Sequence, residues 1–579
     1  MFIMERILEI ITKVVKDLFD LNTGVVLSRP EAKFGDLATN VALTLAGRLG
    51  KNPAASDGKA VAGRPREIAE QIAAELKNHD DFTSVEVAGA GFINMRLSDA
   101  YLTHELNTML ATPNDYGRPE TYKNQIVVTE FSDPNPFKVL HVGHLYTSIV
   151  GDAISRLIEL AGGEVHRVNF GGDVGMHVAK CIWGIITKLG GENPENLPTD
   201  LPIGERMQWV ASSYVDGNKA YENDETKTEI ADINKRIYQL FDMDEHDTPF
   251  ARIYWTCRSW SYEYFDNFYD RIDVQFEKYY PESATAPLGL KTVQEQTKKS
   301  VFKESNGAII FDGEPYGLHT RVFINSEGLP TYEAKDVGLS LTKWQDYHFD
   351  KSFIITGVDI IDYMKVVIKS IEQFEPELAA RTEHITHGMM KLAGAVKMAS
   401  RLGNFLKAED VLDMVENYQK EAQGAINQDT VLGAVRYALL KNRLGPDIIF
   451  EPETSVNAQG NSGPYLQYSH ARARSILRKI GFDKQNSLSE NQDFDEYERP
   501  LLVKLTEWPE ILTTAVDELA PHVICTYMYE LAQIFNRFYE NSRVEGDPRA
   551  GIRTCLVAAY ADILRNGLGV LGIVAPEKM

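Results

Sequence analysis

Two histidines that flank a glycine form the most informative turn of the sequence. His141 and His144 stand on either side of Gly143 in the stretch 139-VLHVGHLYTS-148. A β-branched run precedes them and apolar residues at helical spacing follow, so the turn is predicted to join a strand to the N-terminus of a helix. Free N–H groups and the helix dipole favour a phosphate there, and imidazole donors could stabilise charge on a phosphorus-bound oxygen. We therefore predict that this turn acts on a nucleotide phosphate.

The elements around the turn predict a β–α–β unit of a parallel sheet. The run 125-QIVVTEF-131 is short and β-branched, as expected of a buried strand. Helical spacing then continues to Gly162 and Gly163, where the helix should end, and 165-VHRVNF-170 begins the next strand. Open parallel sheets bind ligands at the carboxyl ends of their strands. The sequence therefore predicts a Rossmann-type α/β catalytic domain with the histidine turn at its ligand-binding edge.

Length and pattern predict three domains. A chain of 579 residues with 44% hydrophobic content can form several packed cores. We predict an N-terminal α+β domain over 1–112, the catalytic domain over 113–425 and an all-α helical bundle over 426–579. A helical insertion is expected at about 191–300, and residues 191–250 carry 14 acidic against 5 basic side chains. The simplest interpretation of that excess is a solvated acidic face.

The charge balance limits the expected partners. The formal net charge is 60 − 83 = −23, which argues against non-specific binding along DNA. Residues 433–480 reverse the balance, with 7 basic against 3 acidic side chains. Four scattered cysteines without CxxC spacing favour a reducing compartment and no protein-held metal. Without a signal peptide or an apolar run of about 18 residues, we expect a cytoplasmic protein with no membrane partner.

The histidine turn resembles the HIGH signature of class I aminoacyl-tRNA synthetases and related nucleotidyltransferases. Enzymes of that class carry a second, lysine-containing signature downstream, and 397-KMASR-401 stands where their KMSK motif would. Ala399 and Ser400 depart from that motif, which puts stabilisation of the triphosphate in doubt. The residues that the resemblance assigns to the nucleotide are His141, Gly143, His144, Lys397, Met398 and Arg401.

The position of Lys138 suggests why the second motif departs from KMSK, because one family of the class shows both features. Arginyl-tRNA synthetases commonly lack the second lysine of KMSK and carry one just upstream of the HIGH motif. Lys138 stands three residues before His141, so the two anomalies explain each other. The chain therefore resembles the arginyl-tRNA synthetases. The resemblance implies that Lys138 is a catalytic cation, which holds the departing pyrophosphate together with Lys397 and Arg401.

A site for arginine needs carboxylates in the plane of a guanidinium, because this group presents five N–H donors and a permanent charge. Glu130 closes an apolar strand, where a charge without a partner is costly. Tyr332 and Asp336 are four residues apart and share one face if helical. By resemblance, Glu130 and Asn135 take the α-amino and carboxylate side of the substrate, and Tyr332 and Asp336 take its guanidinium.

Two further positions are candidates for the arginine pocket. Asp362 lies in 356-TGVDIIDYMKVV-367, where the family places a polar residue. His177 stands where many members have glutamine, and it is interpreted either as a substrate-site residue or as a packing histidine. The insertion is short and acidic, so we expect no editing domain. Unpaired polar groups in such a pocket would suffice to reject uncharged analogues.

Both ends of the chain resemble the tRNA-binding parts of the same family. Residues 34–53 resemble the N-terminal domain that meets the tRNA elbow, and 460–479 resemble part of the helical anticodon-binding domain. Unpaired anticodon bases are held by stacking and base-edge hydrogen bonds, so cations beside aromatic residues are the candidates. Leu466 and Tyr468 are expected in the core instead. The residues assigned to tRNA are Arg436, Tyr465, Arg472 and Arg474.

The resemblance also implies the reaction. ATP and arginine would form arginyl-adenylate and pyrophosphate, with Mg²⁺ accompanying ATP and without a protein nucleophile. The arginyl group would then pass to the terminal ribose of tRNA(Arg). We expect a monomer that needs bound tRNA before it activates arginine. Two alternatives stay open, namely a class I enzyme for another amino acid such as lysine, and an RNA-binding paralogue that has lost catalysis.

Overall fold

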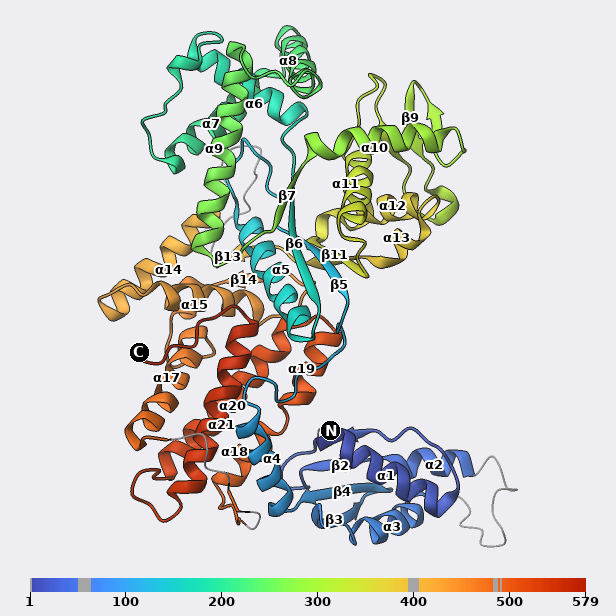
Figure 1. The fold of residues 1–579 in the computed structure, drawn as a ribbon, viewed down its shortest axis with the longest axis vertical. Coiled ribbons are helices and arrows are strands. Elements are labelled where there is room, and N and C mark those ends of the chain that lie inside the picture. Colours follow the sequence, from blue (N-terminus) through green and yellow to red (C-terminus); the bar gives the residue numbers. More distant parts are fainter. Residues whose placement is uncertain (1–2, 50–63, 394–405, 483–487, 490–491) are drawn as a thin grey trace.

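A five-stranded parallel sheet forms the centre of the molecule (Figure 1). The computed structural model describes residues 3–49, 64–393, 406–482, 488–489 and 492–579. The strands stand in the order β12-β11-β5-β6-β7, and every neighbouring pair is parallel. The sequence order reverses between β5 and β11, where doubly wound sheets bind ligands beyond the carboxyl ends of their strands. The strands are β5 Ile126–Glu130, β6 Glu164–Gly171, β7 Lys278–Pro281, β11 Lys351–Gly357 and β12 Thr382–His387.

The strands β5 and β6 and the helix between them form the predicted β–α–β unit. All residues of β5 after Ile126 are buried, as expected of a strand covered on both faces. The helix α5 spans Val142–Leu160, and its C-cap is Ala161, next to the predicted stop at Gly162. The fold class predicted for the catalytic domain is confirmed.

A group of helices is inserted between β6 and β7. Residues 191–250 lie in it, as predicted, but the insertion ends earlier than residue 300, because β7 pairs with β6 in the central sheet. Asn223 caps α8 by accepting hydrogen bonds from the N–H groups of Glu225 and Thr226. The helices are α6 Met176–Leu189, η2 Pro194–Asn196, α7 Ile203–Ala220, α8 Asp224–Asp242 and α9 Pro249–Arg271.

A second lobe, on the right in Figure 1, lies between β7 and β11 and continues after β11. The helices α10 and α11 approach closely because two glycines face the opposite backbone. A Cβ on Gly338 would lie 2.1 Å from the carbonyl oxygen of Thr285, and a Cβ on Gly289 would lie 1.9 Å from that of Ala334. This contact fixes α11 beside the sheet. The elements are α10 Glu282–Thr297, β8 Lys303–Ser305, β9 Ala308–Phe311, η3 Glu314–Tyr316, β10 Arg321–Ile324, α11 Tyr332–Tyr347, η4 Val358–Ile360, α12 Ile361–Glu372 and α13 Pro376–Arg381.

The N-terminal domain is a four-stranded antiparallel sheet covered by helices. Its first helix is amphipathic and buries Ile3, Ile7 and Ile11. The domain is tied to the C-terminal bundle by forked ion pairs, in which Arg499 donates to both oxygens of Asp36 at 2.9 and 2.7 Å. The elements are α1 Ile3–Phe19, β1 Leu27–Ser28, β2 Leu37–Thr39, α2 Val41–Leu49, α3 Pro65–Leu76, β3 Phe82–Ala88, β4 Phe92–Leu97 and α4 Asp99–Ala111.

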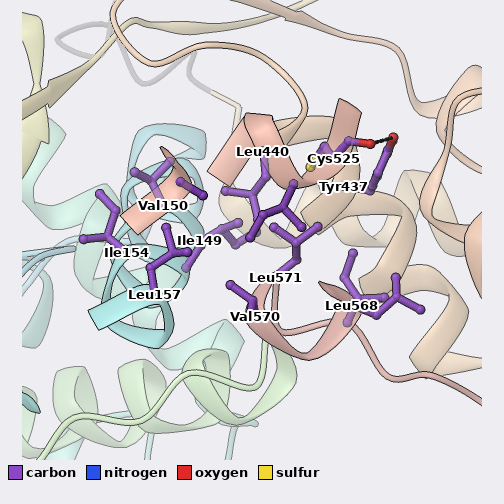
Figure 2. Packing of buried hydrophobic residues seen from close by; sticks show 14 of the residues in the cluster. Ile149, Val150, Ile154, Leu157, Tyr437, Leu440, Cys525, Leu568, Val570 and Leu571 are labelled. Carbon is purple, nitrogen blue, oxygen red and sulfur yellow. Dashed lines mark hydrogen bonds between the residues drawn. The ribbon is translucent and has the colours of Figure 1, made fainter. Parts of the chain in front are cut away.

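The C-terminal part is a helical bundle that packs directly against α5 (Figures 1 and 2). Figure 2 shows Ile154 and Leu157 of α5 in one apolar cluster with Leu440 and Leu571 of the bundle. The helix that follows the histidine turn is thus buried between the sheet and the bundle. The elements are β13 Met390–Leu392, α14 Ala408–Gln423, α15 Gln428–Leu440, β14 Ile448–Phe450, α16 Pro452–Ser455, α17 Gly463–Ile480, α18 Glu498–Leu505, α19 Trp508–Asp517, α20 Pro521–Asn541 and α21 Ala550–Val570.

Within the described ranges, no helix is both long enough and apolar enough to cross a bilayer.

Candidate active site

A cavity of about 1210 Å³ opens beyond the carboxyl ends of β5 and β11. It lies at the reversal of strand order, the place that the topology favours for a ligand. Its wall includes Glu130 at the end of β5, Gly357 at the end of β11 and the first turn of α5. The volume exceeds the roughly 300–1000 Å³ of common small-molecule pockets, so a nucleotide and an amino acid can share it.

The loop that joins β5 to α5 is held in an unusual backbone conformation. Ser132, Asp133 and Phe137 have φ values of 73°, 48° and 67°, a region that side chains other than glycine seldom adopt. Phe137 is buried, and Ser132 is hydrogen-bonded to the hydroxyl of Tyr269 at 2.8 Å, so surrounding packing enforces this shape. Strain of this kind accumulates at functional loops, and here it shapes the floor of the cavity.

The histidine turn caps the N-terminus of α5. The N–H of Gly143 donates to Nδ1 of His141 at 3.1 Å, and the N–H of His141 donates to Nδ1 of His144 at 3.1 Å. The ring centroids are 3.8 Å apart, and both rings line the cavity. Because each Nδ1 accepts a hydrogen bond, each neutral ring carries its proton on Nε2. Two Nε2–H donors therefore stand at a helix N-terminus, an arrangement suited to a phosphate oxygen.

A glycine is required at position 143 for a structural reason that the sequence did not reveal. A Cβ at this position would lie 2.8 Å from both Cε1 and Nδ1 of His141. The glycine therefore makes room for the imidazole that caps the helix. Gly143 also lines the cavity.

Burial and nearby positive charge keep both imidazoles neutral. Burial, followed by Lys138, lowers the pKa of His141 to about 4, although part of its ring reaches the solvent of the cavity. Burial also holds the pKa of His144 well below its usual value, and His141 and Lys138 add to the shift. Lys138 Nζ lies 5.1 Å from the ring centroid of Tyr214, and Lys138 is not among the described residues that line the cavity. Lys138 therefore acts on the turn through its charge.

Carboxylates and tyrosines gather at the other end of the cavity. Burial raises the pKa of Asp336 to about 8, against the hydrogen bond that the Tyr363 hydroxyl donates to it, and Glu130 and Glu282 contribute to the rise. Tyr332, four residues before Asp336 on α11, is 55% exposed and lines the same cavity. The helical spacing predicted from the sequence thus brings Tyr332 and Asp336 to one wall. A cationic ligand here would relieve the cost of ionising Asp336.

Glu282 is a cavity carboxylate that the sequence analysis missed. It is 2% exposed and stands at the first position of α10, directly after β7. Lys335 Nζ lies 2.5 Å from its Oε2. Burial lowers the pKa of Lys335, but the charge and hydrogen bond of Glu282, together with Tyr238 and Tyr332, raise it overall. An acidic residue at a strand's carboxyl end was the available signal, but β7 lay inside the range predicted to be helical.

Glu130 and Asn135 both line the cavity, as their predicted role requires. The buried charge of Glu130, which would be costly alone, is paired with Lys343 of α11, and this lysine donates a hydrogen bond to the carboxylate. Asn135 accepts the N–H of Gly172 at its Oδ1 at 2.9 Å. That bond fixes the orientation of the amide and leaves its NH₂ group as the donor toward a ligand carboxylate.

Two predicted pocket residues are placed elsewhere. The side chain of Asp362 is 69% exposed and pairs with Lys365 at 3.2 Å, so its assignment to the pocket was wrong. The chain passes through η4 into α12, and this turns Asp359 and Tyr363 toward the cavity and Asp362 toward solvent.

His177 is likewise not among the described residues that line the cavity. Its Nε2 donates to the carbonyl oxygen of Gly172 at 2.8 Å, and burial, followed by Lys138, lowers its pKa to about 3. Gly172 itself lines the cavity and is bonded to Asn135. The geometry supports the packing interpretation, in which His177 holds Gly172 in place.

The second signature cannot be placed in the same way. Lys397, Met398 and Arg401 lie outside the described residues. Met390 and Leu406, on either side of that segment, both line the cavity.

Arg436 is not a surface cation, which corrects its assignment to tRNA. It is fully buried, and its Nη1 donates to Asp152 of α5 at 2.7 Å. Its Nη2 donates to the carbonyl oxygens of Ile272 and Asp273 at 2.8 and 2.9 Å, and Nη1 also reaches the carbonyl of Leu571 at 3.2 Å. Arg436 therefore ties α15 to α5, to the end of α9 and to the end of α21. The sequence could not show this because every partner is more than a hundred residues away.

The other tRNA candidates lie on two sides of α17, because Tyr465 and Arg472 contact α20 and Arg474 contacts the C-terminal segment. Arg472 stacks on Tyr468 and Tyr539, with Cζ 4.8 and 5.3 Å from the ring centroids. Arg474 donates from Nε to both oxygens of Glu577 at 2.9 Å. The hydroxyl of Tyr465 accepts a hydrogen bond from Asn536 at 2.7 Å.

The two apolar predictions for α17 had different outcomes. Leu466 is buried as predicted, whereas Tyr468 is 42% exposed, so the prediction that it packs in the core was wrong. The exposed ring supports Arg472 at the surface.

Comparison with known proteins gives the class and then the family. The family described as "tRNA synthetases class I (R), catalytic domain" matches residues 105–450, so the chain has the catalytic domain of a class I aminoacyl-tRNA synthetase. "Arginyl tRNA synthetase N terminal domain" matches residues 3–97, and "DALR anticodon binding domain" matches 466–579. The chain therefore belongs to the arginyl-tRNA synthetases, which use ATP to charge tRNA(Arg) with arginine.

Curated relatives and solved structures cover almost the whole chain. It is 28% identical over 539 residues to the arginine–tRNA ligase of Bdellovibrio bacteriovorus, covering 90% of each protein. It is 29% identical over 538 residues to that of Clostridium perfringens, covering 89% of this chain and 91% of the relative. The fold resembles arginyl-tRNA synthetase from Plasmodium falciparum, with a TM-score of 0.78, 21% identity and 99% coverage of both chains. The Thermus thermophilus enzyme gives a TM-score of 0.76 at 22% identity, with 100% coverage of both chains.

Proposed function

We propose that this cavity performs both steps of arginine transfer with the residues described above. The observation that carries the proposal is the division of one cavity into an imidazole end at the start of α5 and a carboxylate end around Asp336. ATP is an anion and the arginine side chain is a cation, so the two ends match the two substrates. The arginine carboxylate attacks the α-phosphorus in line, pyrophosphate leaves, and a ribose hydroxyl of tRNA(Arg) then accepts the arginyl group. Positioning and charge stabilisation suffice, and no protein nucleophile takes part.

At the carboxylate end, Asp336 and Tyr332 bind the guanidinium. Glu282, paired with Lys335, borders the same space. Glu130 and Asn135 receive the α-amino and carboxylate groups of the substrate. This placement follows from their position at the end of β5 and in the strained loop, between Asp336 and the histidine turn.

At the imidazole end, His141 and His144 donate from Nε2 to the α-phosphate oxygens as charge develops on them. Lys138 and the segment with Lys397, Met398 and Arg401 supply positive charge toward the pyrophosphate. Mg²⁺ enters as part of the substrate, bound to the triphosphate. Within the described part of the chain, no group of three or more His, Cys, Asp or Glu side chains could hold a metal ion.

The tRNA is proposed to contact α17 at its anticodon and the N-terminal domain at its elbow. Arg472, Arg474 and Tyr465 are the proposed anticodon contacts, and Arg436 is removed from that set because it is buried. We further propose a monomeric, cytoplasmic enzyme with domains 1–112, 113–425 and 426–579. The bacterial relatives are consistent with that location.

The test is ATP–pyrophosphate exchange with each of the twenty amino acids, with and without tRNA. We expect exchange with arginine alone, and only when tRNA is present. Exchange with lysine would overturn the assignment of the carboxylate end and favour the lysyl alternative. Silence under every condition would support a binding protein without catalysis.

A further inference from the structure

The hydroxyl groups of Thr147 and Ser148 brace the histidine turn through hydrogen bonds to its backbone. The hydroxyl of Thr147 lies 2.9 Å from the carbonyl oxygen of Gly143, and the hydroxyl of Ser148 donates to the carbonyl oxygen of His144 at 2.7 Å. These are bonds from a side chain to the backbone one helical turn earlier. Both braced carbonyls belong to the turn that carries the two imidazoles. Each hydroxyl also contacts a different neighbouring element, so the turn is held from two sides.

Thr147 also contacts His387, a residue that has no role in the reaction described above. The Nε2 of His387 lies 2.8 Å from Thr147 Oγ1, and Nδ1 lies 2.8 Å from the carbonyl oxygen of Gly388. His387 is the last residue of β12, is 3% exposed, and its ring centroid lies 4.4 Å from that of Tyr146. It therefore connects α5 to β12, a strand on the far side of the reversal of strand order.

Ser148 contacts a different set of residues from those that Thr147 contacts. Ser148 Oγ lies 2.9 Å from Ser132 Oγ, which lies 2.8 Å from the hydroxyl of Tyr269. Asn169 Nδ2 donates to that hydroxyl at 3.2 Å. This second chain of hydrogen bonds ends on α9 and β6 and shares no residue with the first. It serves as an internal control for any effect that passes through Thr147.

The positions of the hydrogens in the network of Thr147, His387 and Gly388 follow from the chemistry of these groups. The carbonyl of Gly388 can only accept, so Nδ1 of His387 carries a proton. Burial lowers the pKa of His387, so the ring is neutral near pH 7 and its Nε2 is an acceptor. The single hydroxyl hydrogen of Thr147 then lies between two acceptors, His387 Nε2 and Gly143 O, and can be donated fully to only one of them at a time.

We propose that His387 is a positioning residue for arginine activation. Through Thr147 it sets the first turn of α5, and with it His141 and His144, relative to β12. The inference rests on the proposed role of these two histidines at the phosphate. His387 lines the cavity but has no contact with a reacting atom in this scheme, so its loss should slow the chemical step and leave arginine binding intact.

A double-mutant cycle in the full-length enzyme tests this route. His387→Phe keeps an aromatic ring and removes both nitrogens, and Thr147→Val removes the hydroxyl. We expect each to lower kcat for tRNA-dependent ATP–pyrophosphate exchange about 10- to 100-fold, with KM for arginine unchanged, because small misplacements of reacting groups have effects of this size. If His387 acts through Thr147, the double variant should be no slower than the slower single variant.

Controls separate positioning from general damage. Ser148→Ala combined with His387→Phe should multiply the two single effects, because the two braces share no residue. His387→Gln can donate to Gly388 and accept from Thr147, so it should recover most of the activity. Thermal unfolding of each variant shows whether the fold is intact. Independent, multiplying effects of His387→Phe and Thr147→Val, or a higher KM for arginine, would overturn the proposal.

The proposed function has a separate test. If His144→Ala does not lower activation, the assigned role of the imidazoles fails, whatever the outcome of the cycle. If His144→Ala abolishes activation and the two brace variants do not couple, the role of the imidazoles stands and only the positioning role of His387 is lost.

Discussion

The two ends of the cavity share one physical condition but carry opposite chemistry. At the imidazole end, burial lowers the pKa of His141 to about 4, and Lys138 adds to the shift. At the carboxylate end, burial raises the pKa of Asp336 to about 8, and neighbouring carboxylates add to it. In both places a neighbouring charge has the sign that the titratable group itself would acquire, although Asp359 opposes the shift at His141. Each end is thereby prepared for a ligand of the opposite charge.

The two ends of the cavity differ in which charged side chains already have a partner of opposite charge within the protein. Glu130 and Glu282 have their own lysine partners, Lys343 and Lys335, whereas Asp336 is bonded to the hydroxyl of Tyr363. Of these three carboxylates, Asp336 is therefore the one whose ionisation a bound guanidinium would change most. In the proposed assignment, recognition of the guanidinium therefore rests mainly on Asp336, and stabilisation of the phosphate rests on several donors at the histidine turn.

The largest expected effect is at the imidazole end. His144→Ala should lower arginine activation about 10²- to 10³-fold, the cost of removing one donor from a developing oxyanion. The measurement is kcat/KM for ATP–pyrophosphate exchange in the presence of tRNA. His246→Ala, which changes an exposed histidine of the insertion, is the matched control and should leave exchange unchanged. A loss of less than threefold for His144→Ala would mean that the imidazoles do not act on the phosphate.

The next effect is at the carboxylate end. Asp336→Asn should raise KM for arginine about 10- to 100-fold, because a hydrogen bond between charged groups contributes ~1.5–3 kcal/mol. KM for ATP should stay within twofold of the unchanged enzyme. The exposed Asp362 provides the control, since Asp362→Asn should have no effect on arginine. If both substitutions raised KM equally, the pocket assigned from the structure would be wrong.

The pH dependence of arginine use makes the comparison quantitative. Asp336 with a pKa of about 8 is mostly protonated in the empty enzyme below that pH, and it must lose the proton to pair with a guanidinium. We therefore expect kcat/KM for arginine to rise about tenfold per pH unit from about pH 6 toward 8 and to level off above, as titration of one group requires. The histidines titrate well below this window. The slope should vanish in Asp336→Asn, and a slope that persists there would assign the titration to another group.

The smallest expected effect is that of Lys138, which acts on the histidine turn without lining the cavity. A single charge at an effective dielectric near 20 contributes on the order of 1–2 kcal/mol, so Lys138→Ala should slow activation about tenfold. Affinity for tRNA should not change, as measured by filter binding. Lys123→Ala, at an exposed ion pair, is the control. Weaker tRNA binding by Lys138→Ala would place this lysine on the RNA path instead.

Local patterns predicted much of the catalytic domain. The β–α–β unit of β5, α5 and β6 followed from apolar periodicity, because strand and helix spacing are encoded within a few residues. The pairing of Tyr332 with Asp336 followed from helical spacing in the same way. The prediction for Asp362 failed because a short 3₁₀ turn precedes α12 and rotates the face that meets the cavity. Glu282 was missed because β7 is a four-residue strand within a largely helical stretch.

The sequence by itself determined the class of chemistry, because the histidine turn, the upstream lysine and the apolar strand before them lie within twenty residues. It also determined the order of the three parts along the chain. Only the tertiary structure decided which charges are available to ligands. Arg436 meets Asp152 from 284 positions away, and Lys343 meets Glu130 from 213 positions away. A buried charge must find a partner wherever the fold brings one, and no local spacing records that choice.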